Sequence, residues 1–246
     1  MREWLGLPVQ ASAHANGIDH VLVIEHWMML GLFVFWFAYL IYALVRFRKG
    51  ASPAASYTGM RSRWAFWVVG GIVGLEAVLL VGYEIPFWKE RTQPPPEGQQ
   101  AVIVRVVAEQ FSWNIHYPGP DGQFGRTDLA LVAPDNPLGL DRRDPAAKDD
   151  ITTINDLVLP VNRTVLIHLT SKDVIHSFGV VAMRIRQDAI PGQRTPVWFV
   201  PTTTGQFEIA CSQLCGLGHY RMRGALTVKT EAEYAAWLRE QAEPAP

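Results

Sequence analysis

The segment Cys211–Met222, with the sequence CSQLCGLGHYRM, places two thiols, an imidazole and a thioether within twelve residues. Cys211 and Cys215 are the only cysteines of the chain. Thiolate and thioether ligands favour copper over magnesium, calcium or manganese. A mononuclear blue-copper site uses one Cys, two His and a weak axial Met, so it has no role for a second thiolate. Two bridging thiolates suit two copper ions, and the segment therefore predicts a binuclear copper site.

The two cysteines could instead form a disulfide or belong to a structural zinc site. A disulfide is favoured in oxidising compartments, but it gives no role to His219 or Met222. A structural zinc site usually draws on Cys and His in two short pairs, whereas here a Met follows His219 by three residues. The full set of side chains therefore favours copper.

A binuclear site needs a second imidazole, and the candidates after residue 100 are His116, His168 and His176. Spacing alone does not choose among them. His168 falls in the middle of a predicted strand, where a partly exposed histidine is common. His176 follows a predicted strand, and loops on a rigid scaffold present functional groups. His176 is therefore the better candidate.

Two apolar segments occupy the first ninety residues. Trp27–Val45 carries no charge, and the second segment, from Trp64 to about Ile85, is interrupted by Glu76. A helix crosses a bilayer core with roughly twenty apolar residues. We therefore expect a transmembrane hairpin over residues 21–91, with spans at about 21–45 and 64–86. A carboxylate within a membrane, such as that of Glu76, is a candidate functional group, although it could equally face a partner helix.

Basic residues bracket the turn between the two spans, whereas the N-terminal segment has only Arg2. The positive-inside rule then places the turn in the cytoplasm and everything after Trp88 on the outer face. Residues 1–20 are expected to form an outer-face extension. The sequence ASAHA near its middle resembles a signal-peptidase site, but the preceding apolar stretch is short for a signal peptide. We therefore expect an uncleaved extension.

The remainder of the chain changes to a β pattern. Residues 92–100 contain three consecutive prolines and are expected to form a semi-rigid linker. Short β-branched and aromatic runs then predict a sandwich or barrel over residues 101–230. Residues 118–156 are rich in Asp, Pro and Gly and are expected to be a long excursion from this core. A short helix is expected within the terminal segment 231–246. The predicted strands are Ala101–Val107, Thr164–Thr170, Thr195–Val200 and Gly205–Ala210.

The order of these features resembles subunit II of cytochrome c oxidase. The resemblance rests on two membrane spans followed by Asp173-Val-Ile-His176-Ser, Asp188-Ala-Ile-Pro-Gly192 and the spacing Cys-x3-Cys-x3-His-x2-Met. It implies a two-helix transmembrane hairpin and an all-β, cupredoxin-like Greek-key barrel that holds a CuA centre. By the resemblance, two bridging cysteines, two histidines, a thioether and a backbone carbonyl bind two coppers; these residues are His176, Cys211, Gln213 (carbonyl), Cys215, His219 and Met222. Asp173 is a candidate to support His176 from outside the ligand set.

The resemblance also implies an oxidoreductase subunit that transfers electrons and performs no bond-making chemistry itself. Cytochrome c, or a haem c domain of a partner complex, would reduce the copper, and subunit I would use the electrons to reduce oxygen to water. The sequence has no Cys-x-x-Cys-His motif, so no c-type haem is expected within it. The expected location is a bacterial cytoplasmic membrane with the C-terminal domain on the periplasmic side. The net charge of −1 gives no indication of nucleic-acid binding.

The chain departs from the family pattern at three places. The family usually has Glu between the two cysteines, where this chain has Gln213; a neutral amide is a poorer ligand for a hard cation, which puts magnesium or manganese at the subunit boundary in doubt. The aromatic residue that accepts electrons aligns with Phe111, and Trp113 lies two residues further on. The glutamate near the start of the second span is missing, and Glu76 lies deeper.

Three other functions are compatible with part of the pattern, and a sequence feature argues against each. A quinol oxidase subunit II shares the architecture but lacks the copper ligands that are present here. A membrane-tethered copper chaperone or sensor would need exchangeable ligands, and the helical hairpin and the Asp-Ala-Ile-Pro-Gly segment argue against it. Nitrous oxide reductase carries a similar copper motif, but this chain has no room for the large catalytic domain of that enzyme.

Overall fold

The computed structural model describes residues 5–51, 57, 62–93 and 101–242. The chain divides into two compact units: one contains residues 1–5 and 19–93, and the other contains residues 6–18 and 94–246. Most of the predicted Pro-rich linker, residues 94–100, lies outside the described residues. The two units are described separately.

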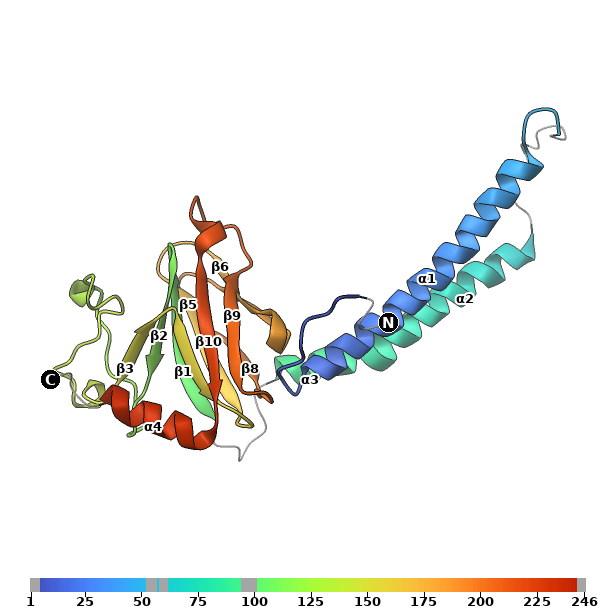
Figure 1. The fold of residues 1–246 in the computed structure, drawn as a ribbon. Coiled ribbons are helices and arrows are strands. Elements are labelled where there is room, and N and C mark those ends of the chain that lie inside the picture. Colours follow the sequence, from blue (N-terminus) through green and yellow to red (C-terminus); the bar gives the residue numbers. More distant parts are fainter. Residues whose placement is uncertain (1–4, 52–56, 58–61, 94–100, 243–246) are drawn as a thin grey trace. The chain divides into compact units, whose positions relative to one another are not determined.

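The first unit is a helical hairpin (Figure 1). Helix α1 spans Ala15–Arg46, and α2 spans Arg63–Leu79 and continues through a π-helical stretch, Leu80–Glu84, into α3, Ile85–Thr92. Both helical runs are long and apolar enough to cross a membrane, with mean hydropathies of 2.2 and 2.1. The first helix begins before the expected residue 21, and the second run ends beyond residue 86.

The side chains of the hairpin face outward, since the apolar windows of both helices contain no buried residues. The hydroxyl of Tyr83 lies 3.3 Å from Nδ1 of His20 and joins the two helical runs near their outer-face ends. Glu76 is exposed on α2. Its role therefore stays a prediction, and contact with another membrane helix is compatible with its position.

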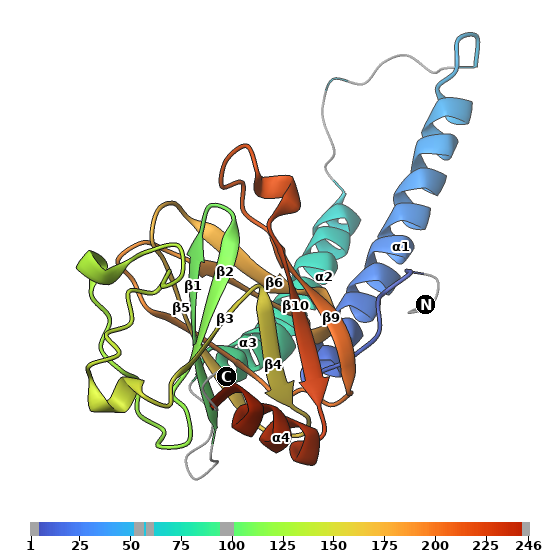
Figure 2. The same cartoon turned by 60° about the vertical axis from the view of Figure 1, so that its left-hand side comes forward.

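The second unit is a sandwich of two five-stranded sheets (Figures 1 and 2). One sheet has the strand order β3-β2-β1-β5-β8, and the other has the order β4-β10-β9-β6-β7. The four strands predicted from the sequence correspond to β1, β5, β8 and β9. The strands are β1 Val102–Glu109, β2 Ser112–Tyr117, β3 Ile151–Ile154, β4 Asp156–Pro160, β5 Val165–Ser171, β6 His176–Val180, β7 Ile185–Ala189, β8 Thr195–Phe199, β9 Gly205–Cys211 and β10 Arg223–Lys229.

Short 3₁₀ turns occupy several connections. Two of them, η2 and η3, lie in the excursion between β2 and β3, where the sequence showed little periodicity. The other two are η4, which follows β6, and η5, which precedes β10. Their bounds are η2 Leu129–Leu131, η3 Pro145–Ala147, η4 Val181–Met183 and η5 His219–Arg221.

Alternation of side chains in β1 and β5 builds the core. In β1, Val104 and Val106 are fully buried, and in β5, Val165 and Ile167 are fully buried. Successive side chains of a strand point to opposite faces of its sheet, so the intervening residues lie on the outer face. The largest buried side chains between the sheets are those of Trp113, Tyr117, Phe178 and Phe199.

Helix α4, Glu231–Ala242, lies at the end of the sandwich opposite the β9–β10 connection (Figures 1 and 2). The ring of Trp237 meets the ring of Tyr117 at a centroid distance of 5.1 Å. The Tyr117 hydroxyl donates to the carbonyl of Val158 and accepts from its N–H. These contacts tie β2 to β4 of the other sheet, and the helix predicted near residue 231 is thereby part of the fold.

The segment that resembles a signal-peptidase site is integrated into the β domain. Ala11 is fully buried, and its N–H donates to the carbonyl of Ala182 over 2.9 Å. The Ser12 hydroxyl donates to the carbonyl of Met183, and the Ala13 N–H donates to the carbonyl of Val200. Cleavage at this site would remove these contacts from the β domain, and the uncleaved extension stays a prediction.

Asn155 forms the corner at which the chain passes from β3 in one sheet to β4 in the other. Its φ of 58° lies in the left-handed region, which Asn tolerates better than most residues. The Trp113 N–H donates to Oδ1 of Asn155, and the Asn155 N–H donates to the carbonyl of Trp113, both over 2.8 Å. The Asn155 carbonyl accepts from the N–H of Ala225 in β10. Asn155 therefore links the two sheets: its side chain and N–H bind β2, and its carbonyl binds β10.

We predict that Asn155→Gly destabilises the β domain by about 1–3 kcal/mol, because the Trp113 N–H loses its partner. Asn155→Ala should cost about 1 kcal/mol more, since alanine resists a positive φ. Thermal unfolding of the full chain, followed by tryptophan fluorescence, measures both. Equal stability of the alanine and wild-type chains would contradict this role.

Candidate metal centre

Three of the predicted ligands lie at the ends of three neighbouring strands of one sheet, and the others lie in the connection from β9 to β10. Cys211 ends β9, His176 begins β6, and Met222 immediately precedes β10. β6 pairs with β9 through Phe178 and Cys211, and the Cys211 N–H donates to the carbonyl of Met222. Because β9 is antiparallel to both neighbours, its end lies beside the start of each. The fold thus brings these ligands together at one edge of the sheet.

The donor atoms of the cluster lie close to one another. The two Sγ atoms are 3.8 Å apart and both thiols are free. Nδ1 of His176 lies 3.1 Å from Sδ of Met222, and Nδ1 of His219 lies 3.6 Å from Sγ of Cys215. Sδ of Met222 is 3.8 Å from the same Sγ. The ligand atoms of His176, Cys211 and Cys215 all lie within 4.8 Å of one another.

The backbone of the loop between the cysteines supplies a further donor. The carbonyl oxygen of Gln213 accepts from the Cys211 thiol over 3.2 Å, while the Gln213 side chain is exposed. The carbonyl of Gln213 therefore faces the cluster, whereas its side chain faces solvent. A substitution of the side chain leaves the carbonyl available to the cluster.

The cluster is largely closed to water. His176, Met222 and Cys215 are buried, whereas Cys211 and His219 are partly exposed. Burial and the neighbouring Cys211 thiol raise the pKa of Cys215 to about 11. In the metal-free chain this thiol keeps its proton at neutral pH, and a metal that binds the thiolate displaces that proton.

Asp173 fixes the orientation of His176. Its Oδ1 lies 2.9 Å from Nε2 of His176, which leaves Nδ1 directed toward the thioether. Partial burial acts to raise the pKa of Asp173, but hydrogen bonds from His176 and from the N–H groups of Gln110 and Val174 outweigh it and lower that pKa. The carboxylate stays ionised and selects the tautomer of His176 that is protonated on Nε2.

Gln110 connects this carboxylate to the cysteine loop. Its N–H donates to Oδ2 of Asp173 over 2.7 Å, and its side-chain amide donates to the carbonyl of Cys215 over 2.6 Å. Nothing in the sequence singled out Gln110. Its position at the tip of the β1–β2 hairpin, immediately before Phe111, is the only signal that could have drawn attention to it.

Phe111 packs against the loop between Cys215 and His219. A side chain at Gly218 would collide with the ring of Phe111, and one at Gly216 would collide with the amide of Gln110. Gly216 also has a φ of 129°, which few other residues adopt. The two glycines therefore allow the ligand loop to lie flat on the β1–β2 hairpin.

Trp113 lies under the centre and not on its surface. It is fully buried, with its ring centroid 6.2 Å from that of His176 and 5.4 Å from that of Phe178. Phe111 is partly buried. The exposed large apolar side chains of the ligand loop are instead those of Leu214, Leu217 and Tyr220. The sequence analysis missed these three, although apolar residues within a Gly-containing loop could have indicated an exposed patch.

The two other candidate histidines lie elsewhere. His116 is buried on β2, with Nε2 2.6 Å from Asp150. Burial, together with Arg105 and Arg142, lowers the pKa of His116, while Asp150 acts in the opposite direction. His168 lies mid-strand in β5, and both histidines line a cavity on the outer face of their sheet. Of the three candidates, only His176 lies in the cluster with the cysteines.

The donor set suits copper better than the alternatives. Two thiols, two imidazoles and a thioether are soft or borderline ligands, and a thioether is not a usual zinc ligand. The buried position of Met222 against both His176 and Cys215 makes it part of the cluster. The residues present therefore fit a thiolate-bridged copper centre.

Comparison with known proteins places the chain in a family. Residues 102–229 match the family described as cytochrome c oxidase subunit II, periplasmic domain. The chain is 34% identical over 240 residues to the alternative cytochrome c oxidase subunit 2 of Bradyrhizobium diazoefficiens, a match that covers 97% of this chain and 84% of the relative. It is 30% identical over 214 residues to cytochrome c oxidase subunit 2 of Cereibacter sphaeroides, covering 82% and 68% of the two chains.

A solved structure is also similar. The periplasmic domain of subunit II of cytochrome oxidase (CoxB) of Bradyrhizobium japonicum is 30% identical, with a TM-score of 0.42, and the match covers 57% of this chain and 92% of that one.

The structure confirms the two predicted apolar helices, and the family match over residues 102–229 is consistent with the predicted cupredoxin-like β domain. The same features fit a two-pass membrane protein whose C-terminal domain lies outside. The family implies copper and assembly with other oxidase subunits. The chain thus belongs to the cytochrome c oxidase subunit II family and is an oxidoreductase subunit of a haem-copper oxidase.

Proposed function

We propose that this subunit receives electrons through a binuclear CuA centre held by His176, Cys211, Cys215, His219, Met222 and the carbonyl of Gln213. The observation that carries the proposal is the pair of free Sγ atoms, 3.8 Å apart, with two imidazole nitrogens and a thioether beside them. Copper bound by these residues would supply a one-electron carrier between a c-type cytochrome and the haems of subunit I.

The protein contributes rigidity and exclusion of water. His176, Cys211 and Met222 lie at the ends of paired strands, and Asp173 locks the ring of His176. Electron transfer is fast when the ligands move little between the two redox states, and buried ligands on strands meet that condition. Outer partners of metal ligands fix both the orientation and the basicity of an imidazole. Asp173 and Gln110 perform this role here.

The donor cytochrome is proposed to contact the apolar surface around the ligand loop. Leu214, Leu217 and Tyr220 are 76%, 97% and 81% exposed. Trp113 is fully buried and cannot touch a protein partner, so direct contact falls to this loop and to Phe111 beneath it. Arg221, whose guanidinium lies 5.8 Å from the Phe111 ring centroid, is the adjacent positive charge.

Two competing functions are less well supported. A quinol oxidase subunit II has no use for six converging donors. A copper chaperone must release its metal, whereas His176 and Met222 are buried and held by strand pairing. We further propose the cytoplasmic membrane of a bacterium as the location, with the copper domain on its periplasmic side.

Replacing a bridging ligand tests the binuclear centre. In Cys215→Ser we expect the mixed-valence EPR signal to disappear, because a hydroxyl is a hard, weakly acidic ligand that does not replace a thiolate. Met222→Leu should keep some copper and shift its reduction potential. Ser212→Ala is the matched control in the same loop and should leave the signal unchanged. A normal spectrum from Cys215→Ser would show that this thiol does not bridge.

Removing the charge of Asp173 tests its support of His176. Asp173→Asn keeps the shape of the side chain but weakens its hydrogen bond to Nε2 of His176. We therefore expect the affinity for copper to fall by about 10–100-fold. Competition with a chelator of known affinity measures this change. Asp188→Asn, on the neighbouring strand β7, serves as the control. Identical copper affinities for the Asp173→Asn and wild-type chains would rule out the proposed role.

Gln213 separates backbone from side-chain function. Gln213→Ala keeps the carbonyl, so the copper spectrum should change little. Gln213→Glu adds a carboxylate, the ligand that hard cations prefer, and should raise manganese occupancy at the subunit boundary. Manganese EPR on the oxidase complex, prepared with manganese in excess, compares the variant with the wild type. A fully occupied manganese site in the wild type would contradict the argument from ligand hardness.

A further inference from the structure

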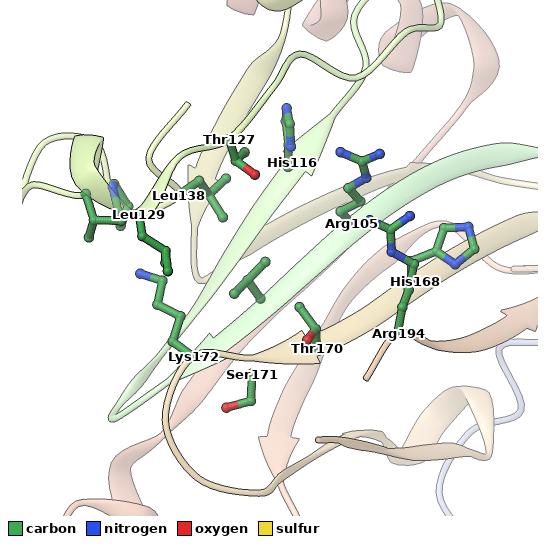
Figure 3. A pocket seen from close by; sticks show the side chains of 13 residues that line it. Arg105, His116, Thr127, Leu129, Leu138, His168, Thr170, Ser171, Lys172 and Arg194 are labelled. Atoms are coloured by element: carbon green, nitrogen blue, oxygen red, sulfur yellow. The ribbon is translucent and has the colours of Figure 1, made fainter. Parts of the chain in front are cut away.

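A cavity of about 600 Å³ lies on the outer face of the sheet that contains β2, β1 and β5 (Figure 3). The excursion between β2 and β3 forms its other wall, through residues such as Leu129 and Leu138. None of the proposed copper ligands lines this cavity. The volume falls in the range of about 300–1,000 Å³ that is typical of small-molecule sites.

Basic side chains form a row across the floor of the cavity. Arg105 of β1 pairs in register with His116 of β2 on one side and with His168 of β5 on the other. Side chains of directly paired residues are neighbours on the same face of a sheet, and like charges in such pairs are destabilising. Arg194 lies beside Arg105 and His168 (Figure 3). A concentration of positive charge at this position needs a compensating group.

The protein neutralises only part of this charge. His116 is paired with Asp150, whose Oδ2 also accepts from the N–H of Gly125. Lys172, at the other end of the cavity, is paired with Glu109 over 2.7 Å. Among the described residues, neither Arg105 nor Arg194 forms an ion pair within 4.0 Å.

The Arg105 guanidinium packs on an aromatic ring, but its Nε has no hydrogen-bond partner among the described residues. The ring is that of Phe124, whose centroid lies 3.9 Å from the guanidinium carbon, and the Nε is buried. Burial and the neighbouring Arg194 lower the pKa of Arg105, with Asp150 acting in the opposite direction. Burial, Arg194 and Arg105 also lower the pKa of His168. Burial is the larger cause of both pKa shifts, and the neighbouring cationic groups add to it.

The opposite wall of the cavity is apolar. Leu129, Val132, Pro137 and Leu138, all from the excursion, line it. In Figure 3 the labelled Leu129 and Leu138 lie on the side away from Arg105, His168 and Arg194. The cavity therefore offers two arginines at one end and mainly hydrocarbon at the other, where the charge of Lys172 is neutralised by Glu109.

We propose that this cavity binds a small organic anion, with a phosphate or carboxylate group on Arg105, Arg194 and His168 and an apolar body against Leu129 and Leu138. Guanidinium groups match such oxyanions through paired hydrogen bonds. The excursion, which contributes nothing to the copper cluster, gains a role as the wall that selects the apolar body. The site is independent of the proposed electron transfer.

Phenyl phosphate is a suitable probe because it joins a phosphate to a compact apolar ring and dissolves in water. Isothermal titration calorimetry on the full chain in phosphatidylcholine nanodiscs should show one molecule bound per chain. Arg194→Gln alters an exposed residue and should weaken binding by about tenfold or more, since hydrogen bonds to charged groups contribute strongly. Arg105→Gln should do the same. Arg223→Gln, on the other sheet, is the charge-matched control and should not alter the affinity.

Two further probes separate the halves of the ligand. Inorganic phosphate lacks the ring and benzyl alcohol lacks the charge, so each should bind about tenfold or more weaker than phenyl phosphate. Nanodiscs that contain phosphatidic acid show whether the natural occupant is a lipid headgroup or a soluble anion. If the lipid headgroup occupies the cavity, it competes and the affinity for phenyl phosphate falls. An unchanged affinity for phenyl phosphate identifies a soluble anion. Absence of phenyl phosphate binding, or equal binding by wild type and Arg194→Gln, would overturn the proposal. Inorganic phosphate binding as tightly as phenyl phosphate would overturn the role of the apolar wall.

Discussion

The approach of Cys211 and Cys215 to 3.8 Å without a covalent bond is the constraint on which the site depends. Two thiols at this distance form a disulfide readily under oxidising conditions, so the surrounding structure has to favour metal binding over that reaction. Strand pairing fixes Cys211, and the amide of Gln110 holds the carbonyl of Cys215. The loop is thus fixed at both cysteines before a metal arrives.

The β sandwich converts this local constraint into a rigid centre. Trp113 fills the core beneath His176, and Asn155 hydrogen-bonds to both sides of the Trp113 backbone. Tyr117 and α4 close the other end of the sandwich, remote from the ligands. The core is thus anchored at both ends, and the ligand end also exposes the apolar side chains of Leu214, Leu217 and Tyr220.

Much of the architecture could be predicted from the sequence because its signals are local. The apolar runs, the alternating strands and the spacing Cys-x3-Cys-x3-His-x2-Met each follow from a short stretch of chain. The choice of His176 over His168 required only the expectation that a histidine in the middle of a strand is partly exposed and does not reach the metal cluster. Even so, His176 begins β6 and is not in a loop as expected, because its pairing with Ala189 of β7 extends the strand to it.

The features that the sequence did not indicate depend on contacts between distant segments. Gln110 lies 105 positions from Cys215, whose carbonyl it binds, and no local pattern distinguishes it. The integration of Ala11 into the β core and the row formed by Arg105 and His168 likewise appear only once strand register is known. The excursion was expected over residues 118–156, but β3 and the start of β4 occupy its last residues. The remainder shows weak periodicity because Asp side chains and 3₁₀ turns organise it, such as Asp144 at the start of η3.

X-ray absorption spectroscopy at the copper edge, on the copper-loaded full chain, tests the central claim most directly. A thiolate-bridged pair predicts sulfur and nitrogen scatterers around each copper together with a strong copper–copper contribution. A spectrum that fits a single copper, with sulfur and nitrogen neighbours but without metal–metal scattering, would contradict the account and leave Cys211 and Cys215 as ligands of one ion.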